Sequence, residues 1–442
     1  MKMKKITFIG AGSMGFTNKL VRDLMTFPAF DDCEIMLMDI DEKRLSYALK
    51  GVQKIVDAGG HHAVVKATMD RREALEGADS VLITILQGGV DVWRYDVEIP
   101  KKYGIDICVG DTRGPGGVFR FLRTAPVMLA IIRDVEKYCP DAIVLNYTNP
   151  MAMLVSYLQS QSDVQLTGLC HSVQGTARML ARWLGIEKEE LDYTCVGINH
   201  QAFYIKLEHD GQDMYPALFE AIKKPEIANE EQVRIEMLKY LHYFPTESSG
   251  HNSEYNAWFR KREDLIEKYC IHGTGWNPGE HAYILKEYMR REDEWEKEYI
   301  EWLEKPIAEE ELLRGEEYAS NIINAVHGDG SPFQFNANLR NKGYVTNIDE
   351  GACVEVPVTI DRQGLKVNGV YTLPDNISAL VNHSAKLEEM AVKGAIHGDK
   401  DLIFQAILQD PLTQSVCSME EIYNMVQEMF EQNADYLSYF KS

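Results

Sequence analysis

The sequence KITFIGAGSMG, residues 5–15, joins a short apolar run to a glycine-rich turn. The run Lys5–Ile9 predicts a buried β-strand, and helical periodicity follows over Asn18–Thr26. A strand, the pattern Gly-x-Gly-x-x-Gly and a helix, in this order, are the fingerprint of a dinucleotide-binding fold, in which glycine lets the backbone approach a pyrophosphate. We predict that five residues of the turn contact the cofactor: Gly10, Gly12, Ser13, Met14 and Gly15.

The rest of the N-terminal half alternates short apolar runs with helical patterns, which is typical of βαβ units and a parallel sheet. Helices are predicted over Lys43–Asp57 and Ala125–Tyr138, where apolar residues recur every three or four positions. We predict a doubly wound, Rossmann-type parallel sheet with these strands: Lys5–Ile9, Glu34–Met38, Ser80–Leu86, Ala142–Leu145, Val164–Leu169 and Tyr193–Val196.

Beyond about residue 200 the pattern changes to that of a mixed α+β domain. At 442 residues the chain exceeds the size at which one core usually stops growing. We therefore predict an α/β protein with a dinucleotide-binding domain over residues 1–196 and a catalytic domain over 197–442. No Pro/Gly/Ser-rich linker separates them, so we expect close packing. The predicted helices are Glu230–Tyr240, His281–Glu304, Ile377–His397 and Met419–Tyr439, and the β-prone segments are Gly343–Asn347 and Cys353–Ile360.

Composition narrows the class of partner. A net charge of -22 repels nucleic acid and anionic membranes. No run approaches eighteen apolar residues, the length of a membrane-spanning helix, and Met1–Lys5 leads directly into a strand. The eight cysteines are scattered without a Cys-x-x-Cys pair. We expect a cytoplasmic protein that acts on a small molecule.

The second predicted strand ends at Asp39. Its carboxylate can accept hydrogen bonds from the adenosine ribose and would repel a 2′-phosphate, which favours NAD over NADP. Lys43 and Arg44 can in principle reach a 2′-phosphate, so the choice is a prediction. Gln87 and Asn146, near the ends of two further strands, are additional predicted cofactor contacts. The competing interpretation is a glycine turn without a ligand.

Cys170 and His200 each follow a predicted strand. Ligands of open α/β sheets bind past the carboxyl ends of strands. Two protein ligands are too few for a closed structural metal site and would leave positions for substrate and water. From spacing alone, a buried cysteine and a capping histidine are the preferred interpretation. A thiolate and an imidazole also suit zinc, iron or nickel, so these side chains do not select a metal.

Four segments, taken with the glycine fingerprint, resemble glycoside hydrolase family four: Asp111-Thr112, Asn146–Pro150, Cys170–Gln174 and Gly197–His200. The resemblance implies NAD and Mn²⁺ as cofactors, with Cys170 and His200 as the metal ligands. It also implies that Asn149 contacts the substrate and that Asp111 raises the basicity of the catalytic base. Homodimers or homotetramers are usual in the family.

His171 departs from the phosphoglycosidase members, which carry an aspartate acid directly after the cysteine. The segment Cys170–Gln174 instead resembles the α-galactosidase branch, which implies a substrate without phosphate. We expect His171 to lie at the substrate and to take part in catalysis. The base is sought in residues 246–255. Tyr255 is the first choice and needs a neighbouring cation, a metal or Arg260, to lower its pKa, whereas Glu247 and His251 need less adjustment.

The resemblance implies a redox route to glycoside cleavage. NAD⁺ takes hydride from C3, a base removes the C2 proton beside the metal, and the aglycone leaves C1. Water then adds and the hydride returns to C3. We predict cleavage of α-galactosides, with α-glucosides and uronides as alternatives. A 2-hydroxy-acid dehydrogenase of the lactate/malate type and a non-catalytic NAD sensor are the hypotheses of other classes.

Overall fold

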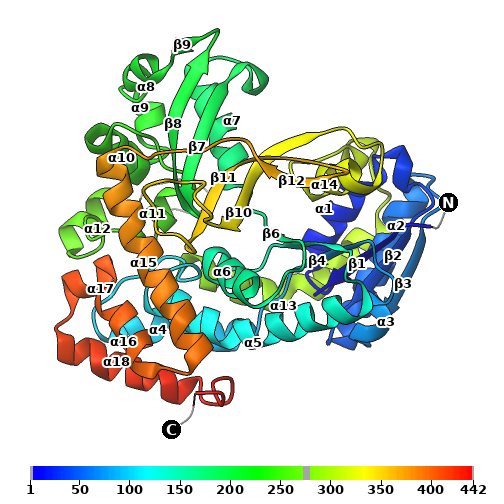
Figure 1. Cartoon of the computed structure of the whole chain (residues 1–442), viewed down its shortest axis with the longest axis horizontal. Coiled ribbons are helices and arrows are strands. Elements are labelled where there is room, and N and C mark those ends of the chain that lie inside the picture. Colours follow the sequence, from blue (N-terminus) through cyan, green and yellow to red (C-terminus); the bar gives the residue numbers. More distant parts are fainter. Residues whose placement is uncertain (1–2, 272–278, 441–442) are drawn as a thin grey trace.

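One mixed sheet runs through the protein (Figure 1). The computed structural model describes residues 3–271 and 279–440. In these residues the strand order is β3-β2-β1-β4-β5-β6-β10-β11-β7-β8-β9, with β12 paired to β11. The strands are β1 Lys5–Ile9, β2 Glu34–Met38, β3 Val64–Thr68, β4 Ser80–Ile83, β5 Ile143–Asn146, β6 Leu166–Gly168, β7 Asp192–Ile198, β8 Gln201–His209, β9 Gln212–Asp213, β10 Phe333–Arg340, β11 Cys353–Asp361 and β12 Gly364–Val367.

Six neighbouring strands form the predicted parallel, doubly wound sheet, in the order β3, β2, β1, β4, β5 and β6. Successive side chains point to opposite faces, so Val81 and Ile83 enter one apolar core while Leu82 enters the other. The first core is covered by α4 Gly89–Lys102, α5 Gly114–Tyr138 and α6 Met151–Gln161, and the second by α1 Met14–Met25, α2 Glu42–Ala58 and α14 Ala319–His327. The Rossmann-type prediction is confirmed.

The prediction of Tyr193–Val196 as a parallel strand is wrong. That segment belongs to β7, which pairs antiparallel with β8 and β11. Asn199 and His200 form the two-residue turn between β7 and β8, and His200 adopts a φ of 63°. Such a turn joins antiparallel strands directly. The sixth parallel strand is instead β3, whose side chains are exposed or only half-buried and which therefore gives a weak apolar signal.

In the second half, β11 and the helices α10 Gln232–Leu241, α13 Tyr283–Glu304 and α15 Asp375–His397 follow the predictions. The β-prone segment Gly343–Asn347 forms only an isolated bridge from Val345 to Tyr371, and the last predicted helix ends early, as α18 Met419–Gln432. The remaining helices are α3 Arg71–Leu75, α7 Ser172–Leu184, α8 Tyr215–Ala221, α9 Pro225–Ala228, α11 Ser249–Tyr255, α12 Glu263–Tyr269, α16 Lys400–Leu408 and α17 Pro411–Val416.

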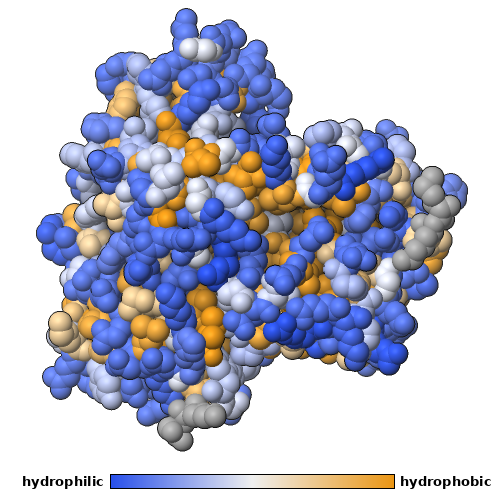
Figure 2. Space-filling view, in the orientation of Figure 1, coloured by the Kyte–Doolittle hydropathy of each residue, from blue (hydrophilic) through white to orange (hydrophobic). Residues whose placement is uncertain are grey.

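The two halves of the chain share the sheet, because β10 and β11 lie between β6 and β7. The predicted boundary at residue 196 falls within β7 and stays a prediction. Figure 2 shows the surface hollowed between the lobe of β7–β9 and the N-terminal lobe, with hydrophobic side chains gathered in the hollow. Among the described helices, α5 is long and apolar enough to cross a membrane, but 78% of its apolar window is buried in the protein, as in a core helix.

Candidate active site

Cys170 and His200 lie close together because β6 and β7 both end near one line of paired residues that crosses the sheet. Cys170 lies just past β6, and His200 lies in the turn after β7. The two strands approach this line from opposite directions, through the antiparallel strands β10 and β11 between them. We predicted that Cys170 and His200 lie close together because both follow parallel strands. They do lie close together, but β6 and β7 are antiparallel to each other. The line consists of Gly168, Asn338, Glu355 and Gly197.

Glu247 completes a group of three possible metal ligands. Ligand atoms of Cys170, His200 and Glu247 all lie within 4.8 Å of one another, and His200 Nε2 is 3.5 Å from Glu247 Oε1. Burial lowers the pKa of His200 to about 4, partly opposed by Glu247, so its imidazole is neutral and can bind a cation. Burial raises the pKa of Cys170, so a metal ion must displace its proton on binding. The sequence indicates a base at Glu247 but gives no sign that its carboxylate lies beside Cys170 and His200.

Asp111, His200 and His251 form a second group of the same size. His251 Nε2 lies 3.8 Å from Asp111 Oδ1, and Asn149 Nδ2 donates to Asp111 Oδ2 at 3.0 Å. Burial opposes ionisation of Asp111, but the neighbouring His251 and Arg120 outweigh it and lower its pKa to about 2. The predicted substrate contact and the predicted helper of the base are therefore hydrogen-bonded to each other, with Asp111 ionised.

Helix α11 places His251 and Tyr255 one turn apart, which puts both on the same face. His251 Nδ1 is 3.2 Å from Glu247 Oε2, and the Tyr255 hydroxyl is 3.3 Å from His200 Nδ1. Burial raises the pKa of Tyr255 well above 10, and the Arg113 guanidinium 4.7 Å from its ring opposes that rise. The predicted role of Arg260 is wrong, because it pairs with Asp106 and donates to Ser253 instead.

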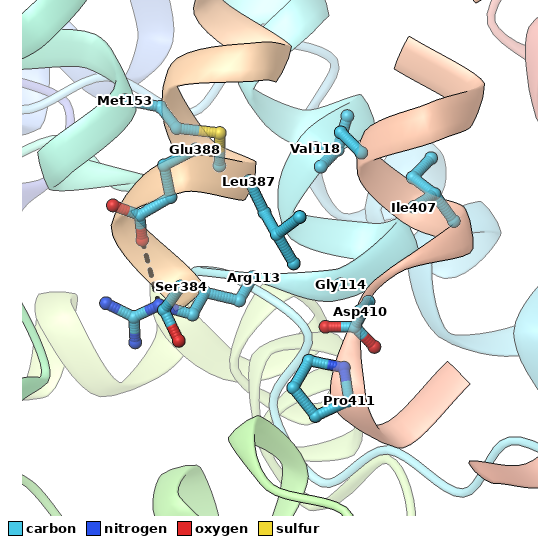
Figure 3. A pocket seen from close by; sticks show the side chains of 11 residues that line it. Arg113, Gly114, Val118, Met153, Ser384, Leu387, Glu388, Ile407, Asp410 and Pro411 are labelled. Atoms are coloured by element: carbon cyan, nitrogen blue, oxygen red, sulfur yellow. Dashed lines mark ion pairs between the residues drawn. The ribbon is translucent and has the colours of Figure 1, made fainter. Parts of the chain in front are cut away.

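Arg113 was missed by sequence reasoning, although it directly follows the Asp111-Thr112 motif. Its Nη2 donates to Asn199 O at 2.5 Å, next to His200. Its Nε forms an ion pair at 2.8 Å with Glu388 Oε1, drawn as the dashed line in Figure 3. A small cavity of about 20 Å³ adjoins this pair and reaches Asp410. Burial raises the pKa of Glu388 to about 7, against the opposing effect of Arg113. Arg113 thus ties the site to α15.

His171 is the exposed member of the predicted site. It precedes α7 and its side chain is 60% accessible, with Nδ1 3.7 Å from Glu317 Oε1. Its positive form would lower the pKa of Glu247, so the two side chains are near enough to interact. His171 therefore lies at the rim of the cluster, open to a substrate that enters from solvent.

Glu355 lies on the floor of the site and was also missed. It is fully buried in β11, near the side chains of Asn199 and Asn338. Burial raises its pKa to about 8, and the nearby Glu247 adds to the rise. The sequence signal was a lone acid inside the apolar strand segment Cys353–Ile360. A buried acid with this pKa is neutral at pH 7.

We predict that Glu355→Gln makes stability less dependent on pH. The folded-state pKa of about 8 lies above the ordinary value of 4.5, so the folded protein holds an extra proton between these values. Wild-type stability then falls as pH rises from about 5 to 8, by at most about 5 kcal/mol at 1.36 kcal/mol per unit. Urea unfolding of metal-free protein at several pH values measures this. Equal pH slopes in wild type and variant would contradict it.

The glycine turn forms an open cradle between β1, β2 and β4. Gly10 has a φ of 86°, and a Cβ there would lie 2.3 Å from Thr84 O. The Gly12 N–H donates to Asp39 Oδ2 at 2.7 Å, which brings the predicted ribose-binding acid against the turn. Nothing lies within 4 Å of a Cβ placed on Gly15. Ser13 is exposed, whereas Met14 is buried.

The two remaining predicted cofactor contacts have structural partners. The Asn146 amide is fully buried and donates to Thr148 O, and Gln87 O accepts from Arg123 Nε at 3.2 Å. Contact of either residue with a cofactor stays a prediction. Ile40, which sequence reasoning overlooked, is 82% exposed directly after Asp39.

Comparison with known proteins places the chain among the glycosyl hydrolases. The family model described as "Family 4 glycosyl hydrolase" matches residues 5–186, and that of its C-terminal domain matches residues 195–413. The chain belongs to family 4. The family match confirms the predicted glycosidase class and gives no support to the dehydrogenase hypothesis.

Curated relatives and solved structures agree with the family. The chain is 38% identical to an alpha-galactosidase of Rhizobium meliloti (strain 1021), covering 98% of this chain and 89% of the relative. It is 35% identical to an alpha-galactosidase of Bacillus subtilis (strain 168), covering 99% and 100%. The structure of the putative glucosidase lplD from Bacillus subtilis superposes with a TM-score of 0.83 at 26% identity, covering 97% and 99%. A 6-phospho-alpha-glucosidase from gut microorganisms, in complex with NAD and Mn²⁺, shares the fold with a TM-score of 0.81 at 19% identity, covering 98% and 99%.

Proposed function

We propose that the protein hydrolyses α-galactosides that carry no phosphate, using NAD and Mn²⁺ bound in one site. The observation that carries the proposal is the convergence of Cys170, His200 and Glu247 within 4.8 Å. The full-length similarity to two alpha-galactosidases supports the choice of sugar. The histidine at position 171 supports a substrate without phosphate, because the resembling phosphoglycosidases have an aspartate there.

The residues fit both cofactors. The turn leaves room for a pyrophosphate at Gly15, where nothing lies within 4 Å of a Cβ, while Asp39 can bind the ribose and Ile40 can cover the adenine. Neutral His200, the Cys170 thiolate and the Glu247 carboxylate would hold a divalent cation. When bound, NAD⁺ accepts and returns a hydride, and the cation acidifies the proton at the neighbouring carbon.

The chain's own residues would position the sugar and move its protons. Asn149 can donate to a sugar hydroxyl and accept from another, and Asp111 fixes its amide. Tyr255 is the proposed base at C2, with Arg113 and the cation favouring its ionised form. His251, beside Glu247 and Asp111, can relay the proton. His171 at the rim is placed to protonate the departing aglycone.

A panel of 4-nitrophenyl glycosides tests this function in the whole protein with thiol reductant. We expect the α-galactoside to be cleaved best, and only when NAD⁺ and Mn²⁺ are both present. Preference for an α-glucoside or an α-galacturonide would refute the proposed sugar. Cleavage that persists in EDTA without NAD⁺ would refute the cofactors, and steady NADH formation from 2-hydroxy acids would revive the dehydrogenase hypothesis.

We also propose a cytoplasmic location and a homodimer or homotetramer. The eight cysteines, all within the described residues, form no disulfide, as is usual in a reducing compartment. The oligomeric state rests on the family resemblance, and light scattering of the purified protein measures it directly.

A further inference from the structure

Asp39 and Arg44 flank the same point of the glycine turn. A Cβ placed on Gly12 would lie 2.7 Å from Asp39 Oδ2 and 2.9 Å from Arg44 Cβ. A ribose held by Asp39 would therefore bring its 2′ position close to Arg44 and to the preceding residue, Lys43. Basic side chains at this place are what an enzyme uses to accept the 2′-phosphate of NADP.

Helix α13, from the second half of the chain, binds the positively charged side chains of Lys43 and Arg44. Arg44 Nη2 donates to both carboxylate oxygens of Glu292, at 2.6 and 2.5 Å, and its guanidinium lies 4.6 Å from the centre of the Trp295 ring. Lys43 Nζ lies 2.7 Å from Glu296 Oε2. The acids and the tryptophan occur at three- and four-residue spacing, so they share one face of α13.

The same face is fixed at two further points. Tyr47 of α2 donates its hydroxyl hydrogen to Glu296 Oε1 at 3.0 Å. Tyr299 of α13 is hydrogen-bonded to Asn18 of α1, whose Nδ2 lies 3.0 Å from the Tyr299 hydroxyl oxygen. Contacts with α1 and α2 therefore keep Glu292 and Glu296 in place against Arg44 and Lys43.

We propose that α13 sets the choice of dinucleotide: Glu292 and Glu296 occupy Arg44 and Lys43 and add negative charge where a 2′-phosphate would bind. The proposal rests on the proposed NAD site at Asp39. It assigns cofactor specificity to two acids about 250 residues away in the sequence from Lys43 and Arg44. The excluded ligand class is any dinucleotide with a phosphorylated adenosine ribose.

The test compares NAD⁺ and NADP⁺ binding to the whole protein by calorimetry at low, fixed ionic strength. In the double variant Glu292→Gln/Glu296→Gln we expect NADP⁺ to bind about tenfold more tightly, a size typical of a few exposed charges, with NAD⁺ changed less than about twofold. Adding Arg44→Ala to that variant should remove the gain.

The matched control is Glu294→Gln/Glu298→Gln, which removes the same charge from the same helix at residues that face Arg290 of α13 itself. An equal gain in the control, or unchanged selectivity in a double variant that binds NAD⁺, would overturn the role of α13. If the double variant does not fold, Arg44→Ala in the wild-type background decides, because unchanged weak NADP⁺ binding supports an occupied arginine and weakened binding overturns it. Failure of the wild type to bind NAD⁺ would instead refute the proposed function.

Discussion

Replacing Cys170 by serine, or His200 by alanine, should lower glycoside hydrolysis by more than about a hundredfold. Mutating even the partners of metal ligands costs 10–100-fold, so loss of a ligand itself should cost more. Each change removes one donor from the group of three within 4.8 Å and leaves Glu247 to hold the cation with one partner. Turnover of 4-nitrophenyl α-D-galactopyranoside at saturating NAD⁺, titrated with Mn²⁺, measures the loss.

NAD⁺ affinity should stay within about threefold in both variants, because the glycine turn lies at β1 while the metal cluster lies past β6 and β7. Cys417→Ser is the matched control for the thiol, since Cys417 Sγ lies 3.2 Å from Tyr103 O and belongs to neither group of possible metal ligands. We expect wild-type turnover from this control. Retained Mn²⁺-dependent activity in Cys170→Ser or His200→Ala would contradict the metal site.

Gly10→Ala should weaken NAD⁺ binding by at least about tenfold. Its φ of 86° is costly for alanine, and the added Cβ would lie 2.3 Å from Thr84 O. That oxygen belongs to the backbone after β4, so the clash can be relieved only by moving the turn away from the sheet. Calorimetric titration should then show affinity weaker by at least about tenfold, the equivalent of 1.4 kcal/mol of backbone strain.

The control for this change is Gly175→Ala in α7. A Cβ at Gly175 has nothing within 4 Å, and its φ is not in the left-handed region. Alanine there should leave NAD⁺ binding unchanged and slightly favour the helix. Near-UV circular dichroism shows whether Gly10→Ala remains folded. A folded Gly10→Ala protein that binds NAD⁺ as the wild type does would contradict the assignment of the cradle.

The sequence predicted the parallel half of the fold because its signals are local. A buried strand, a glycine turn and an amphipathic helix repeat within short stretches. The order of the remaining strands depends on pairing between distant segments, such as Asn338 with Gly168 and Glu355 with Gly197, for which no local pattern exists. The exposed strand β3 was missed because only one of its faces carries an apolar pattern.

The site could be predicted where motif and chemistry coincide. Cys170, His200, Asp111 and Asn149 were named from their motifs, and the structure brings them together. Arg113, in contrast, gains its role from contacts with Asn199 and from α15, which sequence spacing cannot show.

Glu247 illustrates the limit of chemistry alone, since a carboxylate suits both a base and a metal ligand. In the structure, Glu247 Oε1 lies 3.5 Å from His200 Nε2, so Glu247 belongs to the group of possible metal ligands. The acids of α13 illustrate the same limit at long range. Nothing in the charge pattern of residues 283–304 indicates that Glu292 binds Arg44 and that Glu296 binds Lys43.

Glycoside cleavage by this route requires that the C3 hydride and the C2 proton both leave the sugar ring before the aglycone does. Hydrolysis rates for 4-nitrophenyl α-D-galactopyranosides deuterated separately at C2 and at C3 test it most directly, with NAD⁺ and Mn²⁺ saturating. We expect a primary isotope effect at one or both carbons, whereas a glycosidase with two catalytic carboxylates breaks neither bond. Equal rates for both deuterated sugars and the unlabelled one, with bond cleavage rate-limiting, would rule out the redox route.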